Sequence, residues 1–271
     1  MRLKYPLGAL ISLPLLPILY IQGAKVKATI PKLPEATGTE GMASSSTSDK
    51  KPLQLLTLGE STIAGVGVET HALGFTGTLA QSLAEMLQTD VRWKVYAKSG
   101  YTAKDVQQKF LPQISEETVD LVVIGLGAND AFALHHPQRW RKDVRNLILQ
   151  IQEMYPTAPI FFCNMPPIKD FPAFTPQMKF VIGNLVEILG EELKILVEEM
   201  PHVYYEGSVI SILEWGRKLE IQDPLAAFFS DGVHPSTFAY QVWARETAKQ
   251  ILDSKALNPS SLKNDVAPNT P

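Results

Sequence analysis

The chain has 271 residues, of which 45% are hydrophobic, and a formal net charge of −3 from 25 basic and 28 acidic side chains. This length allows one large domain or two small ones, and the apolar content is enough for a substantial core. The nearly balanced charge gives no basis for nucleic acid as a partner. The single cysteine, Cys163, excludes an internal disulfide and a cluster of thiolate metal ligands. Because Cys163 ends an apolar run, we interpret it as a buried strand residue.

Residues 1–28 have the layout of an export signal. Arg2 and Lys4 precede an apolar stretch from Leu7 to Ile21, as the basic start and apolar centre of a signal peptide do. The stretch is short for a membrane span, which needs roughly 17 to 25 residues, yet no good cleavage site follows it. We expect export, and an uncleaved membrane anchor is favoured over release into the periplasm or the medium.

Two segments have the composition of unstructured chain. Pro, Gly, Ser and Thr dominate from Pro31 to Lys51 and again near the C-terminus, and such sequences bury too little apolar surface to fold. We therefore predict a disordered linker over residues 29–51 and a disordered tail over residues 256–271. A single folded domain remains, over residues 52–255.

Within that domain, apolar runs of strand length alternate with helical patterns. The predicted strands cover residues 53–58, 91–97, 119–126, 160–163 and 203–205. The predicted helices cover residues 75–87, a short segment from 103 capped by Thr102, and residues 137–154, 176–199 and 235–252. Strands that are apolar on both faces indicate an α/β domain with a parallel sheet covered by helices on both sides. Ligands of such sheets bind at the carboxyl ends of the strands.

Four short motifs fall in loops or next to the ends of these strands. Ser61 follows the first strand, Gly100 the second and Asn129 the third, and Asp231 and His234 precede the last helix. A serine hydroxyl needs a general base, and a third group must orient that base. His234 can be the base and Asp231 can orient it. The Ser61 and Gly100 amides and the Asn129 side chain are candidate donors to an oxyanion, so the motifs indicate a serine hydrolase.

These residues resemble the sequence blocks of the SGNH hydrolases, also called GDSL esterases and lipases. Ser61, Gly100, Asn129 and His234 match the four letters of the name, and Asp231 matches the acid of the family's Asp-x-x-His. The resemblance covers the whole predicted domain. It implies a three-layer α/β/α sandwich with a flavodoxin-like, mostly parallel, five-stranded sheet.

One residue departs from the family pattern. Glu60 stands before Ser61 where the family usually has Asp, and it adds a methylene where the shorter acid normally bonds neighbouring backbone. We expect activity to survive, because this residue does no chemistry. We expect Asp130 to have a structural role, bonding local backbone.

The resemblance implies hydrolysis of carboxylic esters through an acyl-enzyme on Ser61, without a cofactor or a metal. The loops that line the acyl site in this family carry phenylalanines here, at Phe132, Phe171, Phe174, Phe228 and Phe229. Short- to medium-chain acyl esters, thioesters or lysophospholipids fit such a lining. Two alternatives stay open: a deacetylase of acetylated cell-surface saccharides, and a non-catalytic, membrane-tethered binding module in which Glu60 misplaces Ser61.

Other candidate motifs are weaker. The segment Gly65-Val-Gly67-Val-Glu-Thr70 approaches the dinucleotide-binding fingerprint, but Thr70 stands where the third glycine belongs. His135 and His136 are expected in a solvated loop, and no histidines have the spacing of metal ligands. The oligomeric state is not predicted.

Overall fold

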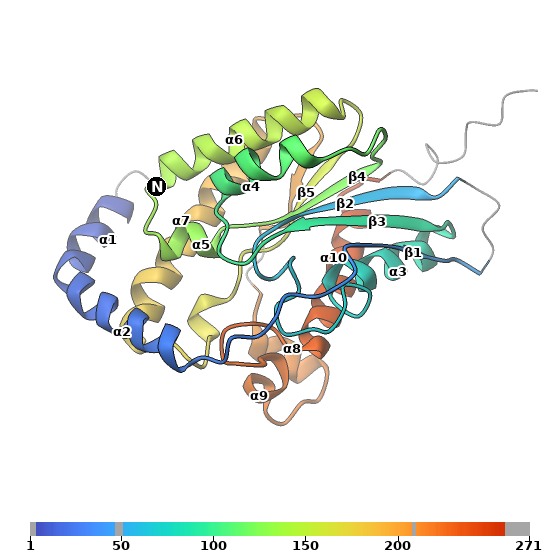
Figure 1. Cartoon of the computed structure of the whole chain (residues 1–271). Coiled ribbons are helices and arrows are strands. Elements are labelled where there is room, and N and C mark those ends of the chain that lie inside the picture. The colour runs from blue at the N-terminus through green and yellow to red at the C-terminus, as the bar shows by residue number, and fades with distance from the viewer. Residues whose placement is uncertain (1–3, 47–50, 208–209, 258–271) are drawn as a thin grey trace, which may run out of the picture.

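The structure is a computed structural model, and it describes residues 4–46, 51–207 and 210–257. At its centre lies a six-stranded sheet with the strand order β1-β3-β2-β4-β5-β6 (Figure 1). Five strands are parallel: β2 (Leu53–Gly59), β3 (Val91–Ala97), β4 (Leu121–Gly125), β5 (Ile160–Phe162) and β6 (Val203–Tyr205). Their order, 2-1-3-4-5 among themselves, is the flavodoxin-like arrangement, so the predicted fold class is confirmed.

Helices cover both faces of the sheet (Figure 1). One face packs against α4 (Ala103–Lys109), α6 (Pro137–Met154) and α7 (Pro176–Glu198), and the other against α3 (Phe75–Leu87) and α10 (Thr237–Asp253). Neighbouring residues of β2 point to opposite faces, because side chains alternate along a strand. Leu56 and Leu58 enter the first core, whereas Leu53 and Leu55 enter the second. A strand buried on both sides has no polar face, which explains why β2 is apolar except at Gln54 and at the buried Thr57.

The helix boundaries follow from local chemistry. Thr102 forms a complete capping box with Asp105, which starts α4 at the predicted residue. Pro137 occupies the first turn of α6, where its missing N–H has no partner to lose. Three short helices were not predicted: α5 (Ala128–Phe132), α8 (Ile212–Lys218) and α9 (Pro224–Phe228).

The predicted disordered linker is corrected by the structure over residues 30–46. Within it, β1 (Glu40–Ala43) pairs antiparallel with β3 and adds a sixth strand to the predicted five. The segment is ordered because its backbone forms hydrogen bonds with the edge of the sheet. Amino-acid composition does not predict such an interaction. Residues 47–50 lie outside the described residues. So does the predicted tail from residue 258 onward, while Leu257 is buried in the second core.

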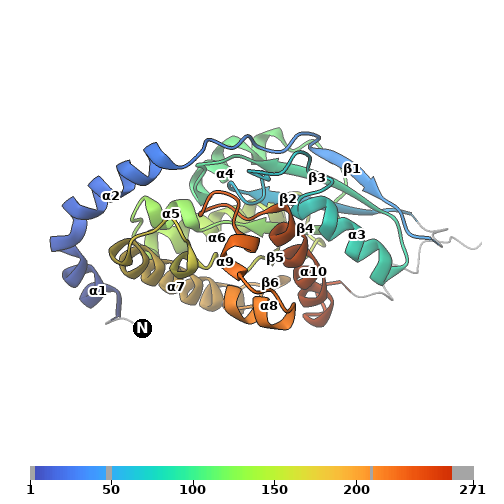
Figure 2. The ribbon, with the colours of Figure 1, turned by 90° about the horizontal axis from the view of Figure 1, so that it is seen from below.

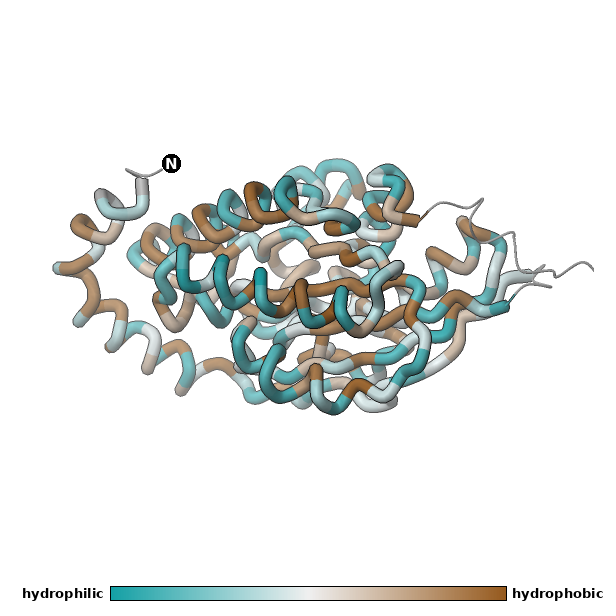
Figure 3. Tube along the Cα trace, turned by 90° about the horizontal axis from the view of Figure 1, so that it is seen from above, coloured by the Kyte–Doolittle hydropathy of each residue, from teal (hydrophilic) through white to brown (hydrophobic). Residues whose placement is uncertain are grey.

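The N-terminal segment is a longer helix than the apolar stretch predicted. It consists of α1 (Lys4–Ser12), a 3₁₀ turn (Leu13–Leu15) and α2 (Leu16–Thr29), and its apolar residues are visible at one end of the molecule in Figure 3. The part from Gly8 to Thr29 has 22 residues and contains an 18-residue window with a mean hydropathy of 1.5. As one straight α-helix, 22 residues at 1.5 Å each would extend about 33 Å, close to the thickness of a bilayer core; here the turn at Leu13–Leu15 bends the segment (Figure 1). The helix has the length and composition of a membrane span or an uncleaved signal sequence.

The N-terminal helix lies beside α7, and residues 30–39 lead from it to β1 along the domain (Figure 2). The N-terminal helix buries few of its side chains against α7. Thr175 donates a hydrogen bond to Gln22 at 2.7 Å, whereas Leu10, Leu13 and Tyr20 remain exposed.

Candidate active site

Three of the predicted site residues follow neighbouring strands at one edge of the sheet. Strand β2 lies between β3 and β4, and Gly59 at its end pairs with Ala97 and with Gly125. Ser61, Gly100 and Asn129 come two, three and four residues after these paired positions. Because parallel strands end at the same edge, the loops that carry the three residues are adjacent.

Glu60 joins two of these loops directly. Its carboxylate accepts hydrogen bonds from the amides of Ala128, at 2.9 Å, and Asn129, at 2.8 Å, and its side chain is buried. These amides begin α5, where N–H groups have no acceptor within the helix and need one from outside it. Burial raises the pKa of Glu60 to about 8, against the two amide hydrogen bonds, which lower it. The extra methylene therefore does not leave the acid unpaired: it fastens Asn129 beside Ser61.

The loop after β3 is a tight turn centred on Gly100. The Tyr101 amide donates to the Lys98 carbonyl at 3.2 Å, and Gly100, the third residue of the turn, has φ +86°. A positive φ at this position is typical of a type II turn and favours glycine. The Tyr101 carbonyl in turn accepts a hydrogen bond from Asn129 Nδ2 at 3.0 Å, which links this loop to α5.

Three donors remain available at this edge. Among the hydrogen bonds of the described residues, the backbone amides of Ser61 and Gly100 have no acceptor, and Asn129 Nδ2 uses one of its two hydrogens. A bare amide next to a substrate can bind a developing negative charge. The arrangement has the donor chemistry that an oxyanion needs.

Asp231 and His234 form a close pair in the loop before α10. The Nδ1 atom of His234 lies 2.8 Å from Asp231 Oδ2, and Asp231 Oδ1 accepts the amides of Val233, at 2.9 Å, and His234, at 2.7 Å. Burial pushes the pKa of Asp231 upward, but these hydrogen bonds outweigh it and hold the pKa below its ordinary value. A carboxylate on Nδ1 leaves Nε2 of the ring as the proton-accepting nitrogen.

The Asp231–His234 loop lies against the loop that carries Ser61. Tyr240, in the first turns of α10, donates a buried hydrogen bond to the Val66 carbonyl at 3.0 Å. A Cβ at Gly67 would lie 3.1 Å from Ser230 Oγ, so the two loops nearly touch. Ser61 and His234 share no hydrogen bond within the described part of the chain. Such bonds are often long before substrate binds and tighten in the complex.

A second aspartate–histidine pair was not predicted. Asp130 is fully buried and accepts the Ala103 amide at 3.0 Å, as its predicted bonding to backbone requires. It also lies 2.9 Å from His135 Nδ1, so the expectation that His135 sits in a solvated loop is corrected. Burial raises the pKa of Asp130, while its bonds to Ala103 and His135 lower it in part. The pair ties the start of α4 to α5 and supports the position of Asn129.

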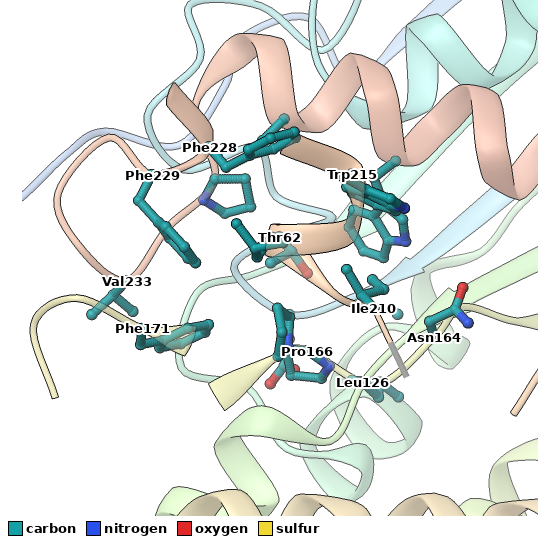
Figure 4. Close-up of a pocket in the computed structure, with 17 residues that line it drawn as sticks. Thr62, Leu126, Asn164, Pro166, Phe171, Ile210, Trp215, Phe228, Phe229 and Val233 are labelled. Carbon is teal, nitrogen blue, oxygen red and sulfur yellow. The ribbon is translucent and has the colours of Figure 1, made fainter. Parts of the chain in front are cut away.

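A small apolar cavity of about 60 Å³ lies beside the candidate residues. Figure 4 shows Phe171 and Phe229 on one side of Thr62 and Trp215 and Ile210 on the other. Of the five phenylalanines expected near an acyl site, Phe171, Phe228 and Phe229 line this cavity. The other two do not: Phe132 is exposed, and Phe174 packs edge-on against Phe171 with 5.3 Å between ring centroids.

Two other kinds of site, a metal centre and a reactive thiol, have little support among the described residues. Over residues 4–46, 51–207 and 210–257 no group of three or more His, Cys, Asp or Glu side chains could hold a metal ion. Cys163 is buried, and burial raises the pKa of its thiol far above the ordinary value.

Comparison with solved structures agrees with the fold described above. The fold is similar to three solved structures: TesA (TM-score 0.54, 18% identity, over 75% of this chain and 99% of that chain), the lipase Lip_vut3 from a goat rumen metagenome (0.54, 19%, 73% and 98%), and a variant of Axe2, an acetylxylan esterase from Geobacillus stearothermophilus (0.52, 17%, 76% and 95%). At these identities the likeness shows the fold alone. A search of curated protein sequences found no match.

The class follows from the family comparison. The model of the GDSL-like lipase/acylhydrolase family matches residues 57–242, which include every predicted site residue. The protein is a carboxylic ester hydrolase. The chain belongs to the GDSL-like lipase/acylhydrolase family, as its resemblance to the SGNH blocks predicted.

Proposed function

We propose that the protein is a serine esterase that hydrolyses carboxylic esters through an acyl-enzyme on Ser61. The observation that carries the proposal is the hydrogen bond of 2.8 Å between Asp231 and His234 Nδ1, in a loop packed against the one that bears Ser61. This pairing sets His234 Nε2 free to accept a proton, which is the role that a serine nucleophile requires of its base.

The proposed reaction proceeds in two balanced steps. His234 Nε2 takes the hydroxyl proton as Ser61 Oγ bonds to the ester carbonyl carbon, and the same proton then passes to the departing alkoxide as the ester C–O bond breaks. Water repeats the sequence on the acyl-enzyme and releases the acid and free Ser61. In both tetrahedral intermediates, the Ser61 and Gly100 amides and Asn129 Nδ2 hold the negative oxygen.

The cavity favours a compact acyl group. Its volume is small, about 60 Å³, and its aromatic lining suits carbon chains. Short- to medium-chain acyl esters, thioesters and lysophospholipids remain the proposed substrates, with the first acyl carbons in the cavity. The small volume suits an acetyl group equally well, so deacetylation of a cell-surface saccharide is the second candidate. Axe2, a structural neighbour, carries the name of an acetylxylan esterase.

The N-terminal helix supports a proposed location outside the cytoplasm. We propose that the chain is exported and stays anchored by residues Gly8–Thr29, which are long and apolar enough to span a bilayer. An anchored esterase would meet substrates at the membrane or the cell surface, where both proposed substrate classes occur.

Turnover of a graded set of substrates tests the proposed function. We expect purified protein to hydrolyse p-nitrophenyl acetate and butyrate, with kcat/KM falling for long acyl chains. The Ser61→Ala variant should lose most or all of this activity and keep its fold. Acetylated xylooligosaccharides distinguish the second candidate, since a deacetylase would prefer them to the aryl esters. Near-normal turnover by Ser61→Ala would refute the mechanism for either substrate.

A further inference from the structure

Residues 31–39, which we call the strap, lie across the loop that carries Ser61. They follow α2 and precede β1, in the segment whose composition predicts disorder. Four backbone hydrogen bonds join the two segments: Gly67 N to Pro34 O (3.0 Å), Ala36 N to Ala64 O (3.0 Å), Thr37 N to Glu69 O (3.1 Å) and His71 N to Thr37 O (2.9 Å). The strap therefore lines the Ser61 loop along most of its length.

Two glycines in the Ser61 loop make room for the strap. A Cβ at Gly65 would lie 2.7 Å from Ala36 Cβ, and one at Gly67 would lie 3.0 Å from Leu33 Cδ1. Both residues also have positive φ, +66° and +89°, which other residues adopt only with strain. The Gly-x-Gly that resembles a nucleotide fingerprint thus serves a close approach of the strap.

Glu35 reaches from the strap to the loop that carries Gly100. Its Oε1 accepts the Ser99 amide at 2.8 Å, and its Oε2 lies 2.9 Å from Lys98 Nζ. Hydrogen bonding to Glu35 raises the pKa of Lys98. The side-chain oxygen of Glu35 gives the Ser99 amide an acceptor, and this bond fixes the residue immediately before Gly100 in the turn.

We propose that Glu35 is a positioning residue for the oxyanion site and that the strap belongs to the catalytic unit. Glu35 holds the Ser99 amide, the turn keeps its shape, and the Gly100 amide stays directed at the oxyanion. The proposal rests on the proposed function, because it concerns the donor at Gly100. A donor fixed in advance stabilises the transition state more than the bound substrate, so its loosening lowers kcat more than it changes KM.

Three substitutions separate the acceptor from the charge of Glu35. Glu35→Ala removes the acceptor, and we expect kcat to fall about tenfold with KM within about twofold, a smaller loss than deletion of a donor. Glu35→Gln keeps a side-chain oxygen for the Ser99 amide, and Lys98→Met removes only the ion pair. Both should keep kcat within about threefold of the wild type.

The matched control is Glu40→Ala. Glu40, the residue after the strap, forms an ion pair with Lys94 and lies in β1 opposite Lys94 of β3. Its described hydrogen bond and ion pair go to a strand and not to a motif loop, so its loss should leave kcat unchanged. Circular dichroism checks that each variant folds. If Glu35→Ala does not fold, Glu35→Gln and Lys98→Met decide. A tenfold loss of kcat in either variant would assign the effect to charge and overturn the proposal.

Failure of this proposal is distinguishable from failure of the proposed function. If hydrolysis depends on Ser61 but folded Glu35→Ala keeps a wild-type kcat, the positioning role is refuted and the esterase mechanism stands. If Glu35→Ala and Glu35→Gln lose kcat equally, the acceptor role is refuted. Hydrolysis that does not depend on Ser61 would refute both.

Discussion

Asn129 is held from two sides, which makes its role separable from that of His234. Its amide donates to Glu60, and its side chain donates to the Tyr101 carbonyl. The remaining side-chain hydrogen is the one that the mechanism assigns to the oxyanion. His234 instead depends on Asp231, in a loop that none of these bonds includes.

Substitution of each residue should therefore have a different kinetic signature. Asn129→Ala should lower kcat by about 10²–10³ with a smaller change in KM, because the lost bond forms mainly in the transition state. His234→Ala should lower turnover far more, because Ser61 loses its base. Steady-state kinetics on p-nitrophenyl butyrate measure both. Asn146→Ala, on α6, is the control and should behave as wild type; a raised KM with unchanged kcat in Asn129→Ala would reassign Asn129 to substrate binding.

Glu60 predicts how stability changes with pH. Its pKa rises from 4.5 to about 8 on folding because the carboxyl is buried, so the folded chain binds this proton more tightly than the unfolded chain. The stabilisation is fully present below about pH 4.5 and is lost as the pH rises through about 8. Glu60→Gln has no proton to lose and should show a flatter decline of Tm between about pH 5 and pH 9. Calorimetry at a series of pH values tests this, and parallel Tm profiles would contradict it.

At the scale of elements, the N-terminal helix and the strap should have separate functions. Full-length protein should sediment with membranes and resist extraction by high salt, because Gly8–Thr29 can span the bilayer. A chain beginning at Ile30 keeps the strap and should be soluble and active. Membrane fractionation and ester hydrolysis measure the two properties. Recovery of soluble mature protein that begins near Ala28 would show a cleaved signal peptide, and salt-released full-length protein would indicate peripheral attachment.

Strands and long helices were predictable because each has a strong local signal. The β2 and β4 runs are apolar on both faces, and α3, α6 and β3 begin and end at the predicted residues. The segment containing β1 has no such signal: Glu40 and Gly41 are poor strand residues, and the strand exists through its pairing with β3. The short helices α5, α8 and α9 are stabilised by their surroundings and carry too little periodicity to be recognised.

The candidate site was likewise predictable only in part. A parallel sheet places Ser61, Gly100 and Asn129 at one edge, so their proximity followed from strand order. The carboxylate contacts of Glu60 with α5, and of Glu35 with Ser99, join residues distant in sequence. Nothing in the local sequence indicates such partners. The cavity was also only partly predictable, because whether a phenylalanine lines it or packs in the core depends on side-chain orientation.

For the whole molecule, the folded domain extends beyond the range predicted from composition. The sheet includes β1, and the strap is hydrogen-bonded to the loop that carries Ser61, so the domain begins near residue 30 and reaches Leu257. The family match covers residues 57–242. Residues 31–39 precede the matched region, and they join the loops of the candidate site to the N-terminal helix.

The central claim is that Ser61 is the nucleophile, and covalent labelling tests it most directly. Full-length protein in detergent is treated with a fluorophosphonate probe, digested, and mapped by mass spectrometry. The mechanism predicts one modified residue, Ser61, with labelling lost in Ser61→Ala, strongly reduced in His234→Ala and slowed but retained in Asn129→Ala. Active protein that is not labelled, or is labelled on another residue with Ser61 unmodified, would contradict the account.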